Sequence, residues 1–253
     1  MARLAPEITI LIPVYNEEES LVMLYQVLLE YLRFTPMPSL VLFVDDCSTD
    51  SSLTIIQGIC KQHSHFGYLS LAKNSGLSSA LKAGIDVCTT TYLGYMDADL
   101  QTSPKEFMSF FQYLPDFHMV TGIRDQRHDS IIKKLSSKIA NQFRRWMIQD
   151  GIQDTCCPLK IMRSDMARQL PFFKGMHRFL PALIQWEGGK VKQIKVTHYQ
   201  RFAGKSKYHL FNRLWGPFLD TLALVWMKNR LIRYEIKQSE LHSNQPLEEA
   251  LIT

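Results

Sequence analysis

Two aspartates stand one residue apart in the stretch YMDADLQTSP, directly after the apolar run TYLGYM. In an extended segment residues i and i+2 point to the same side, so Asp97 and Asp99 can bind one cation together. Without such a partner, two buried carboxylates repel each other and are costly to desolvate. Mg²⁺ and Mn²⁺ prefer oxygen ligands and commonly bind one or two carboxylates together with substrate phosphates. The pattern indicates a metal–diphosphate site, to which Gln101 can add an amide oxygen; the alternative is a helix-entry turn with solvated aspartates.

A repeated strand–helix pattern delivers these aspartates to the end of a strand. It predicts strands at residues 7–14, 40–44, 68–72 and 91–96, and helices at 16–34, 48–62 and 75–88. Such repetition is typical of an α/β fold with a mostly parallel sheet flanked by helices. Ligands of these sheets bind beyond the carboxyl ends of the strands. A second acidic pair, Asp45 and Asp46, follows the second strand and is expected at the same edge.

The sequence also predicts details of the first helix and the elements of the later part of the chain. Asn16 is expected to be the helix N-cap, with Glu19 completing a capping box. Leucines at helical spacing predict one buried face, made of Leu21, Leu24, Leu28 and Leu32. The later pattern predicts a helix beginning at Pro104, strands near 117–122, 157–163 and 190–200, and a basic helix at about 130–149.

Charge is divided unevenly along the 253 residues. Residues 1–120 contain 6 Lys and Arg against 13 Asp and Glu, or −7, whereas residues 121–253 contain 23 against 11, or +12. This division suggests an acidic part that binds a cation beside a basic part that meets phosphates or a membrane surface. The 5 cysteines, with Cys156 and Cys157 adjacent, indicate neither a disulfide framework nor a zinc site, so a reducing compartment is expected. The amino terminus lacks the pattern of a signal peptide.

A helical extension, residues 208–236, is expected between a catalytic domain of residues 1–207 and a polar tail of residues 237–253. Its densest apolar stretch, residues 214–227, is 14 residues long. That is too short to cross a bilayer core of about 30 Å. Basic residues flank this stretch: Arg213, Lys228, Arg230 and Arg233. The pattern favours a helix that lies on anionic lipid or docks on a membrane partner; the alternative is a helix packed on the protein's own core.

Eight short segments together carry a resemblance to a known family. In chain order they are IPVYNEEESL, VDDCSTDSS, KNSGLSSALKAGI, DADLQTSP, TGIR, DTCCPLKIMR, HRFLPAL and RFAGKSKYHLFNRL. The sequence resembles the family 2 glycosyltransferases of GT-A fold, and within them the polyprenyl-phosphate sugar transferases typified by dolichol-phosphate mannose synthase. Cys47 and Cys156 stand where this family usually carries glycine. If either backbone position requires a positive φ, cysteine there costs conformational energy.

The resemblance implies a nucleotide-sugar donor and a Mg²⁺ or Mn²⁺ cofactor. It assigns nucleotide binding to Pro13, Tyr15, Glu17, Asp45, Asp46, Lys73 and Asp97, and metal binding to Asp97, Asp99 and Gln101. A tyrosine just past a strand end offers a stacking face, and Glu17 can accept hydrogen bonds from ribose hydroxyls. The metal contributes charge neutralisation to the departing nucleoside diphosphate.

A lipid-phosphate acceptor is already ionised near neutral pH, so it needs positioning more than deprotonation. Cationic side chains are therefore expected beside the metal, and the basic half supplies Arg124, Arg201, Lys205 and Lys207. The resemblance adds Asp154, which acts as a base or orients the phosphate and the cations. The expected catalytic residues are Asp99, Asp154, Arg124, Arg201 and Lys207.

The resemblance implies an inverting transfer of a sugar from a nucleoside-diphosphate sugar to a polyprenyl phosphate, dolichyl or undecaprenyl, by a protein at the cytoplasmic face of a membrane. One alternative keeps the donor but uses a hydroxyl of a glycolipid or polysaccharide, for which Asp154 must be a true base. A nucleotide-sugar-binding scaffold is a non-enzymatic alternative, although it would not need the aspartate pair. A nucleotidyltransferase is disfavoured because PVYNEEES is acidic where a glycine-rich basic loop is expected. No nucleic-acid partner is expected, and His177 is expected to pack or line the acceptor groove.

Overall fold

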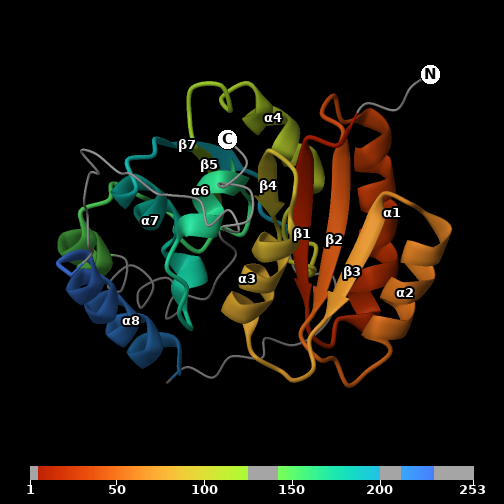
Figure 1. Cartoon of the computed structure of the whole chain (residues 1–253), viewed down its shortest axis with the longest axis horizontal. Helices are drawn as coiled ribbons and strands as arrows, with labels where there is room; N and C mark the ends of the chain where they lie inside the picture. Colours follow the sequence, from red (N-terminus) through yellow and green to blue (C-terminus); the bar gives the residue numbers. More distant parts are fainter. Residues whose placement is uncertain (1–4, 125–141, 200–211, 231–253) are drawn as a thin grey trace, which may run out of the picture.

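The computed structural model describes residues 5–124, 142–199 and 212–230. Its centre is a seven-stranded sheet with helices on both faces (Figure 1). The strands are β1 (Ile8–Val14), β2 (Ser39–Asp45), β3 (Phe66–Ser70), β4 (Tyr92–Tyr95), β5 (Met119–Arg124), β6 (Lys160–Arg163) and β7 (Val191–Val196), in the order β3-β2-β1-β4-β6-β5-β7. Strand β6 is antiparallel to β4 and β5, and the other neighbouring strands are parallel. The predicted mostly parallel α/β sheet is confirmed.

Two layers of helices enclose the sheet. One layer contains α1 (Glu18–Phe34), α2 (Ser52–Gln62), η1 (Pro104–Phe107) and α4 (Met108–Phe111). The other contains α3 (Leu77–Val87), α6 (Ser164–Gln169), η2 (Met176–Arg178), α7 (Leu180–Trp186) and α8 (Asn212–Lys228). Each layer of helices packs a hydrophobic core against one face of the sheet. Central strand β1 contributes to both cores: Ile10 and Ile12 lie in the first and Leu11 lies in the second. A strand buried on both faces explains the continuous apolar run ITILIPV.

The predicted capping box of Asn16 and Glu19 at the start of α1 is wrong. Asn16 has a φ of 52°, and its side-chain oxygen accepts a hydrogen bond from the amide of Thr49 at 2.7 Å. The amide of Glu17 donates instead to the hydroxyl of Ser52, at 2.8 Å. A tertiary contact with the loop after β2 therefore replaces the local cap. The predicted leucine face is confirmed: Leu21, Leu24 and Leu28 are fully buried and Leu32 is partly buried.

Strand β7 ends earlier than predicted, at Val196 rather than near residue 200. Beyond it the chain bonds to groups outside the sheet. The amide of Thr197 donates to the Glu106 carboxylate at 3.3 Å, and the amide of Tyr199 donates to the carbonyl oxygen of Gln101 at 2.9 Å. The segment after β7 is thus brought against the loop that carries the aspartate pair.

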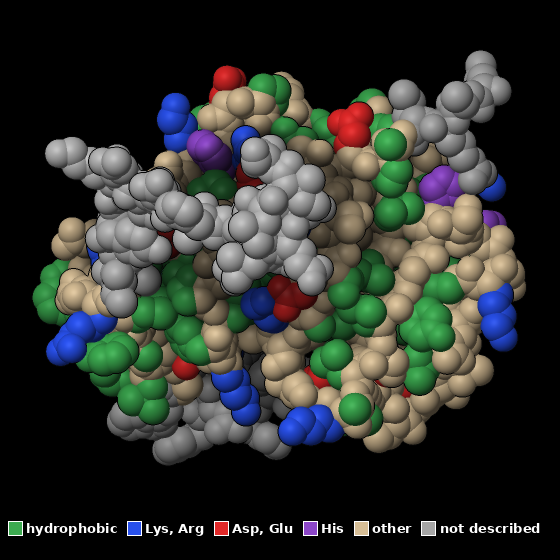
Figure 2. Space-filling view, viewed as in Figure 1, with side chains coloured by type: hydrophobic (Ala, Val, Ile, Leu, Met, Phe, Trp, Pro, Cys, Tyr) green, Lys and Arg blue, Asp and Glu red, His purple; other side chains and the backbone are tan. Residues whose placement is uncertain are grey.

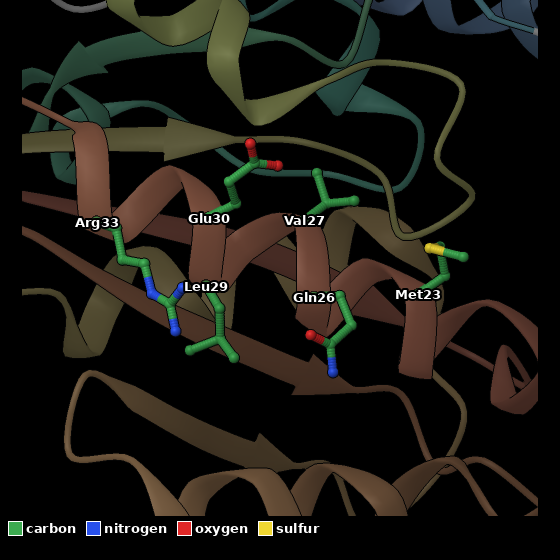
Figure 3. A pocket seen from close by; sticks show the side chains of 6 residues that line it. All are labelled: Met23, Gln26, Val27, Leu29, Glu30 and Arg33. Carbon is green, nitrogen blue, oxygen red and sulfur yellow. The ribbon is translucent and has the colours of Figure 1, made fainter.

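An open pocket of about 370 Å³ lies along one side of α1 (Figure 3). It is lined by Met23, Gln26, Val27, Leu29, Glu30 and Arg33. Helix α1 follows β1 and runs back from the carboxyl end of that strand, so these residues lie toward the opposite edge of the sheet from the aspartate pairs. The pocket is therefore separate from the candidate active site.

Candidate active site

The ends of four strands gather charged residues at one edge of the sheet. Asp45 is the last residue of β2, and Asp97 follows the end of β4. Because β6 runs in the opposite direction, its first residue, Lys160, lies beside Tyr95, the last residue of β4. Strand β5 ends at Arg124 on the far side of β6. The topology thus brings acidic groups from β2 and β4 to cationic groups from β5 and β6.

Asp97 and Asp99 form the acidic centre of this edge. Asp97 is partly buried and accepts a hydrogen bond from the Tyr95 hydroxyl at 2.8 Å. Asp99 is 8% exposed and accepts one from the amide of Gln101 at 3.1 Å. Burial, followed by the negative charge of Asp99, raises the pKa of Asp97 to about 6, against the opposing influence of Tyr95, Arg124 and Lys160. The two carboxylates therefore interact, as the sequence pattern predicts.

The donor set at this edge fits a hard divalent cation. Two carboxylates with room for phosphate oxygens are the usual protein share of a Mg²⁺ or Mn²⁺ site. Among the residues that the structure describes, no group of three or more His, Cys, Asp or Glu side chains is arranged to hold a metal. The amide and carbonyl of Gln101 are engaged with Asp99 and Tyr199, so only its side-chain amide is available for the predicted role.

The raised pKa of Asp97 predicts a pH-dependent stabilisation by metal. The folded protein retains a proton on Asp97 that the unfolded chain has released between about pH 4 and pH 6, so this group lowers stability as the pH rises through that range. Cation binding needs the ionised form, which is present above about pH 6. We expect Mn²⁺ to raise the unfolding temperature more at pH 7.5 than at pH 5, and Asp97→Asn to abolish this difference. Equal shifts at the two pH values in wild type would contradict the assignment.

Arg124 and Asp154 form a buried two-pronged ion pair. The guanidinium Nε donates to Asp154 Oδ2 at 2.8 Å and Nη2 donates to Oδ1 at 2.9 Å. The backbone amide of Arg124 adds a third bond to Oδ2 at 3.2 Å. Burial opposes the charge of Arg124, but the bonds and charge of Asp154 outweigh it, so the pKa of Arg124 lies above its ordinary value. Asp154 thus orients a permanently charged, planar guanidinium, whose binding of a phosphate remains a prediction.

The loop before Asp154 is held by two arginines that the sequence reasoning did not select. Arg144 is 5% exposed, forms an ion pair with Asp150 and donates to the carbonyl oxygen of Ile152 at 2.5 Å. Arg145 donates to the carbonyl oxygen of Gln153 at 3.1 Å. Both come from the helical segment 142–148. These bonds fix the backbone immediately before Asp154.

Lys160 is the principal site residue that the sequence reasoning missed. It is 1% exposed, and its ammonium group donates to the carbonyl oxygens of Thr155, at 3.2 Å, and Cys157. Burial is the largest influence on this group and lowers the pKa of Lys160. Its charge acts on Asp97, whose pKa it lowers. The available signal was a lysine inside the apolar segment PLKIM, at a position predicted to lie in a strand.

The second acidic pair shapes the loops at the ends of β2 and β3. Asp45 is fully buried and accepts hydrogen bonds from the amide of Ser48, at 3.2 Å, and the hydroxyl of Ser70, at 3.0 Å. Asp46 is 4% exposed and accepts bonds from the amides of Ser75, at 2.7 Å, and Gly76, at 2.8 Å. Asp46 therefore holds residues 73–76, which we call the donor loop. Contacts of either aspartate with a nucleotide remain predictions.

The other predicted nucleotide-binding residues lie around the same rim. Pro13 is in β1, beside β2, and Tyr15 and Glu17 follow the end of that strand. Tyr15 is 36% exposed, so its ring is accessible to a base. Lys73 is exposed in the donor loop. The structure thus gathers these side chains at one rim, and their binding of a nucleotide remains a prediction.

Cys47 has a φ of 61°, so it occupies the left-handed region in which glycine is favoured. Cys156 is absent from the described residues with positive φ, so its departure from the family pattern brings no such strain. The cost of a cysteine at a positive φ therefore applies to Cys47 and not to Cys156.

Cys47→Gly is expected to stabilise the protein by about 1 kcal/mol, because a Cβ in this region costs about 1–2 kcal/mol and glycine loses part of that gain through the entropy of the unfolded chain. For a protein of this size the unfolding temperature should rise by about 2–4 °C. Cys47→Ala is the control, since it removes the thiol and keeps the Cβ. Equal unfolding temperatures for the glycine and alanine variants would contradict the strain argument.

Three predicted phosphate ligands lie outside the described residues: Arg201, Lys205 and Lys207. The described chain leads toward the site up to Tyr199, which bonds to Gln101.

His177 lies in η2, and its Nδ1 is 2.8 Å from the hydroxyl oxygen of Ser78 on α3. Burial, with the charges of Arg178 and Lys160, lowers the pKa of His177 to about 3, so this imidazole is neutral near pH 7.

Comparisons with known proteins show which family the chain resembles. Residues 9–170 match the family model of glycosyl transferase family 2. Dodecaprenyl-phosphate galacturonate synthase of Rhizobium johnstonii is 29% identical over 229 residues, which cover 87% of this chain and 67% of that protein. Undecaprenyl-phosphate 4-deoxy-4-formamido-L-arabinose transferase of Pectobacterium carotovorum is 32% identical over 203 residues, covering 79% of this chain and 62% of that protein. The chain thus spans about two thirds of the length of these relatives.

A solved structure shares the fold. Glucosyl-3-phosphoglycerate synthase of Mycobacterium tuberculosis, in complex with Mn²⁺ and UDP-glucose, has a TM-score of 0.65 at 12% identity, covering 90% of this chain and 80% of that chain. At this identity the likeness concerns the fold alone. The family match runs from β1 to the end of α6 and includes both aspartate pairs, Arg124, Asp154 and Lys160. The chain therefore belongs to glycosyl transferase family 2.

Proposed function

We propose that the protein is a metal-dependent, inverting sugar transferase with a nucleoside-diphosphate sugar as donor and a polyprenyl phosphate as acceptor. The observation that carries this proposal is the strand edge at which Asp97 and Asp99 meet the buried cations Arg124 and Lys160. The carboxylates suit a cation that neutralises a diphosphate, and the guanidinium of Arg124 suits a second phosphate. The relatives, a dodecaprenyl-phosphate galacturonate synthase and an undecaprenyl-phosphate sugar transferase, support the same class of acceptor.

The donor half of the site comprises the aspartates and the rim around β1 and β2. Tyr15 offers a stacking face for the base, and Lys73 offers a positive charge for the phosphates. Asp97 and Asp99 hold Mg²⁺ or Mn²⁺, with the side chain of Gln101 as a further ligand. When bound, the cation supplies charge neutralisation to the departing diphosphate.

The acceptor half favours a phosphate over a hydroxyl. Asp154 accepts three hydrogen bonds from Arg124, which commits its oxygens to orienting that guanidinium. A phosphate monoester is ionised near neutral pH and does not need Asp154 as a base. Arg124 holds the phosphate in line for a single displacement, which inverts the sugar configuration, and Arg201 and Lys207 are proposed to complete the cationic cradle.

Helix α8 supports a peripheral position on a membrane. Among the described residues, no helix combines the length and apolarity needed to span a bilayer. The buried side of α8 contains Thr221 and Leu224. Its outer side exposes large apolar residues, which with the nearby Trp146 form what we call the lipid face: Trp146, Phe218, Leu219, Leu222 and Trp226. Figure 2 shows hydrophobic side chains exposed over α8 with Lys and Arg side chains beside them. Exposed apolar side chains with adjacent cations suit an anionic bilayer surface at the cytoplasmic side.

The double variant Leu222→Ser/Trp226→Ser should bind about 100-fold more weakly to vesicles of equal parts phosphatidylglycerol and phosphatidylcholine. Burying each apolar side chain in the interface is worth about 1.5 kcal/mol, and about 3 kcal/mol is close to a factor of 100. Cosedimentation measures the partition. Val22→Ser/Phe34→Ser is the matched control, since these α1 side chains are 59% and 68% exposed. Equal losses in both double variants would exclude a specific lipid face.

The proposed function is tested with labelled sugars. The full chain is incubated with a panel of UDP- and GDP-sugars and Mn²⁺, with and without undecaprenyl phosphate, and label is followed into the organic phase. We expect one donor to give acceptor-dependent transfer. Label that stays water-soluble with every donor would overturn the proposal, and nucleotide binding without turnover would favour the scaffold alternative. Transfer to a glycolipid hydroxyl, but not to the phosphate, would favour the other acceptor class.

A further inference from the structure

Helix α8 makes a charged contact with the turn that contains η2. Arg178 donates to Asp220 Oδ2 at 2.8 Å, and the two side chains are 23% and 21% exposed. The carboxylate of Asp220 also lies against the backbone of Gly175. A Cβ at Gly175 would be 2.2 Å from Asp220 Oδ2, and Gly175 has a φ of 94°. Residue 175 therefore has to be glycine for two reasons, its backbone conformation and the carboxylate beside it.

The same turn is bonded to the start of α3. The amide of Gly175 donates to the hydroxyl oxygen of Ser78 at 3.0 Å, and Nδ1 of His177 is 2.8 Å from that oxygen. Ser78 is 6% exposed and stands in the first turn of α3. Two residues before it, Gly76 is the N-cap of α3. A continuous set of contacts therefore leads from Asp220 to the first turn of α3.

The start of α3 is also the end of the donor loop. The amides of Ser75 and Gly76 donate to the Asp46 carboxylate, and the hydroxyl of Ser79 donates to the carbonyl oxygen of Ser75 at 2.9 Å. Any displacement of the first turn of α3 therefore changes the geometry at which Asp46 holds the loop. Ser78 links the two segments, because its hydroxyl oxygen bonds to both the amide of Gly175 and Nδ1 of His177.

Among the described residues, α8 also makes apolar and aromatic contacts. Leu224 is fully buried, Phe218 stacks on Phe143 with ring centroids 4.9 Å apart, and Lys228 lies 5.3 Å from the centroid of Trp186. Such contacts tolerate small shifts of a helix. The Asp220 contact is directional, because it needs both the hydrogen bond from the Arg178 guanidinium and a surface without a side chain at residue 175.

We propose that Asp220 is a positioning residue that couples the seating of α8 to the shape of the donor loop, through Gly175 and Ser78. This inference rests on the proposed function in taking residues 73–76 as donor-binding and α8 as lipid-facing. Lipid contact that holds α8 in place then favours donor binding, and donor binding favours lipid contact to the same extent, because such coupling is reciprocal. The protein would thus bind its soluble donor better where its lipid acceptor is present.

The first test measures hydrogen exchange in the full chain without ligand. In Asp220→Ala the amides of Ser75 and Gly76 should exchange about tenfold faster than in wild type, because their local opening becomes easier. Asp86→Ala is the control, since it removes an exposed ion pair with Lys82 from α3 itself. Unchanged exchange at the two amides in Asp220→Ala, or the same acceleration in the control, would overturn the coupling.

The second test measures donor use. Asp220→Ala should raise the KM for the donor and the Kd for UDP or GDP with Mn²⁺ about fivefold to tenfold, with kcat within about twofold of wild type. A loss of folded protein alone would lower the apparent kcat and leave KM unchanged, and that outcome contradicts the proposal. Asp220→Asn keeps the fit against Gly175 and one acceptor oxygen, so it should retain most of the wild-type affinity.

A double variant checks that the contact between Gly175 and Asp220 is responsible for the change in donor binding. Gly175→Ala should weaken donor binding from the other side of the contact, and Gly175→Ala/Asp220→Ala should be no worse than the poorer single variant. Full additivity would contradict a shared contact. Accelerated exchange in Asp220→Ala without any sugar transfer by wild type would leave the coupling standing and refute only the proposed function.

Discussion

Asp99→Ala is expected to lower kcat/KM for sugar transfer about 1,000-fold, because removing one group that stabilises developing charge costs about 100- to 1,000-fold in rate and this group is also a proposed metal ligand. Asp99 is buried in the turn after β4 and accepts a hydrogen bond from the amide of Gln101. Burial, followed by the negative charge of Asp99, raises the pKa of Asp97. Titration with Mn²⁺ in the presence of UDP or GDP should show weakened metal binding in the same variant.

Two further variants separate the effect of the Asp99 charge on activity from that of its side-chain length. Asp99→Glu keeps the charge on a longer side chain and should recover part of the activity, whereas Asp99→Asn should resemble the alanine variant. Asp116→Ala, at an exposed aspartate of the loop before β5, is the control for an acidic residue remote from the site. Wild-type turnover by Asp99→Ala would refute the metal assignment.

Site residues at the strand ends were predictable because the alternation of strand and helix signals shows where each strand ends. The pattern placed Asp45 and Asp97 at carboxyl ends, and parallel pairing of β1 with β2 and β4 then put them at the same edge of the sheet, with β1 between them. The interaction of Asp97 with Asp99 was predicted from their spacing in an extended segment, whereas Asp99 lies in a turn. The leucine face of α1 is a local feature, since its period is that of the helix.

Residues that act through tertiary contacts were not predictable in this way. Lys160 becomes a site residue only because β6 is antiparallel and enters beside Tyr95, and nothing local to β6 fixes that direction. The cap of α1 comes from Ser52, 35 residues later in the chain. The Asp220 contact depends on where α8 packs, which apolar periodicity leaves open. An orienting role of Asp154 toward the cations was one of the two predicted roles, but its pairing with Arg124 in particular emerges only from the packed structure.

Arg124→Ala is expected to destabilise the protein by about 3–5 kcal/mol, because it leaves the buried carboxylate of Asp154 without its partner. The two side chains are 16% and 7% exposed, so water replaces little of the lost interaction. Denaturant unfolding measures the change. Arg163→Ala is the matched control: Arg163 and Asp165 form a similar pair at 2.7 Å but are 47% and 50% exposed, and its loss should cost at most about 1 kcal/mol. Similar costs for the two variants would show that burial of the Arg124 pair contributes nothing.

Asp154→Asn then distinguishes the orienting role from that of a base. The asparagine side chain keeps one oxygen that can accept from Arg124, so an orienting role predicts a loss of about tenfold, mainly in the KM for the lipid acceptor. A general base contributes about 100- to 10,000-fold, and its loss would appear in kcat. A drop of that size in kcat, with an unchanged KM, would contradict the orienting role and favour a hydroxyl acceptor. Arg124→Lys sharpens the comparison, because lysine keeps the positive charge without the planar fork and should also act mainly on the KM for the acceptor.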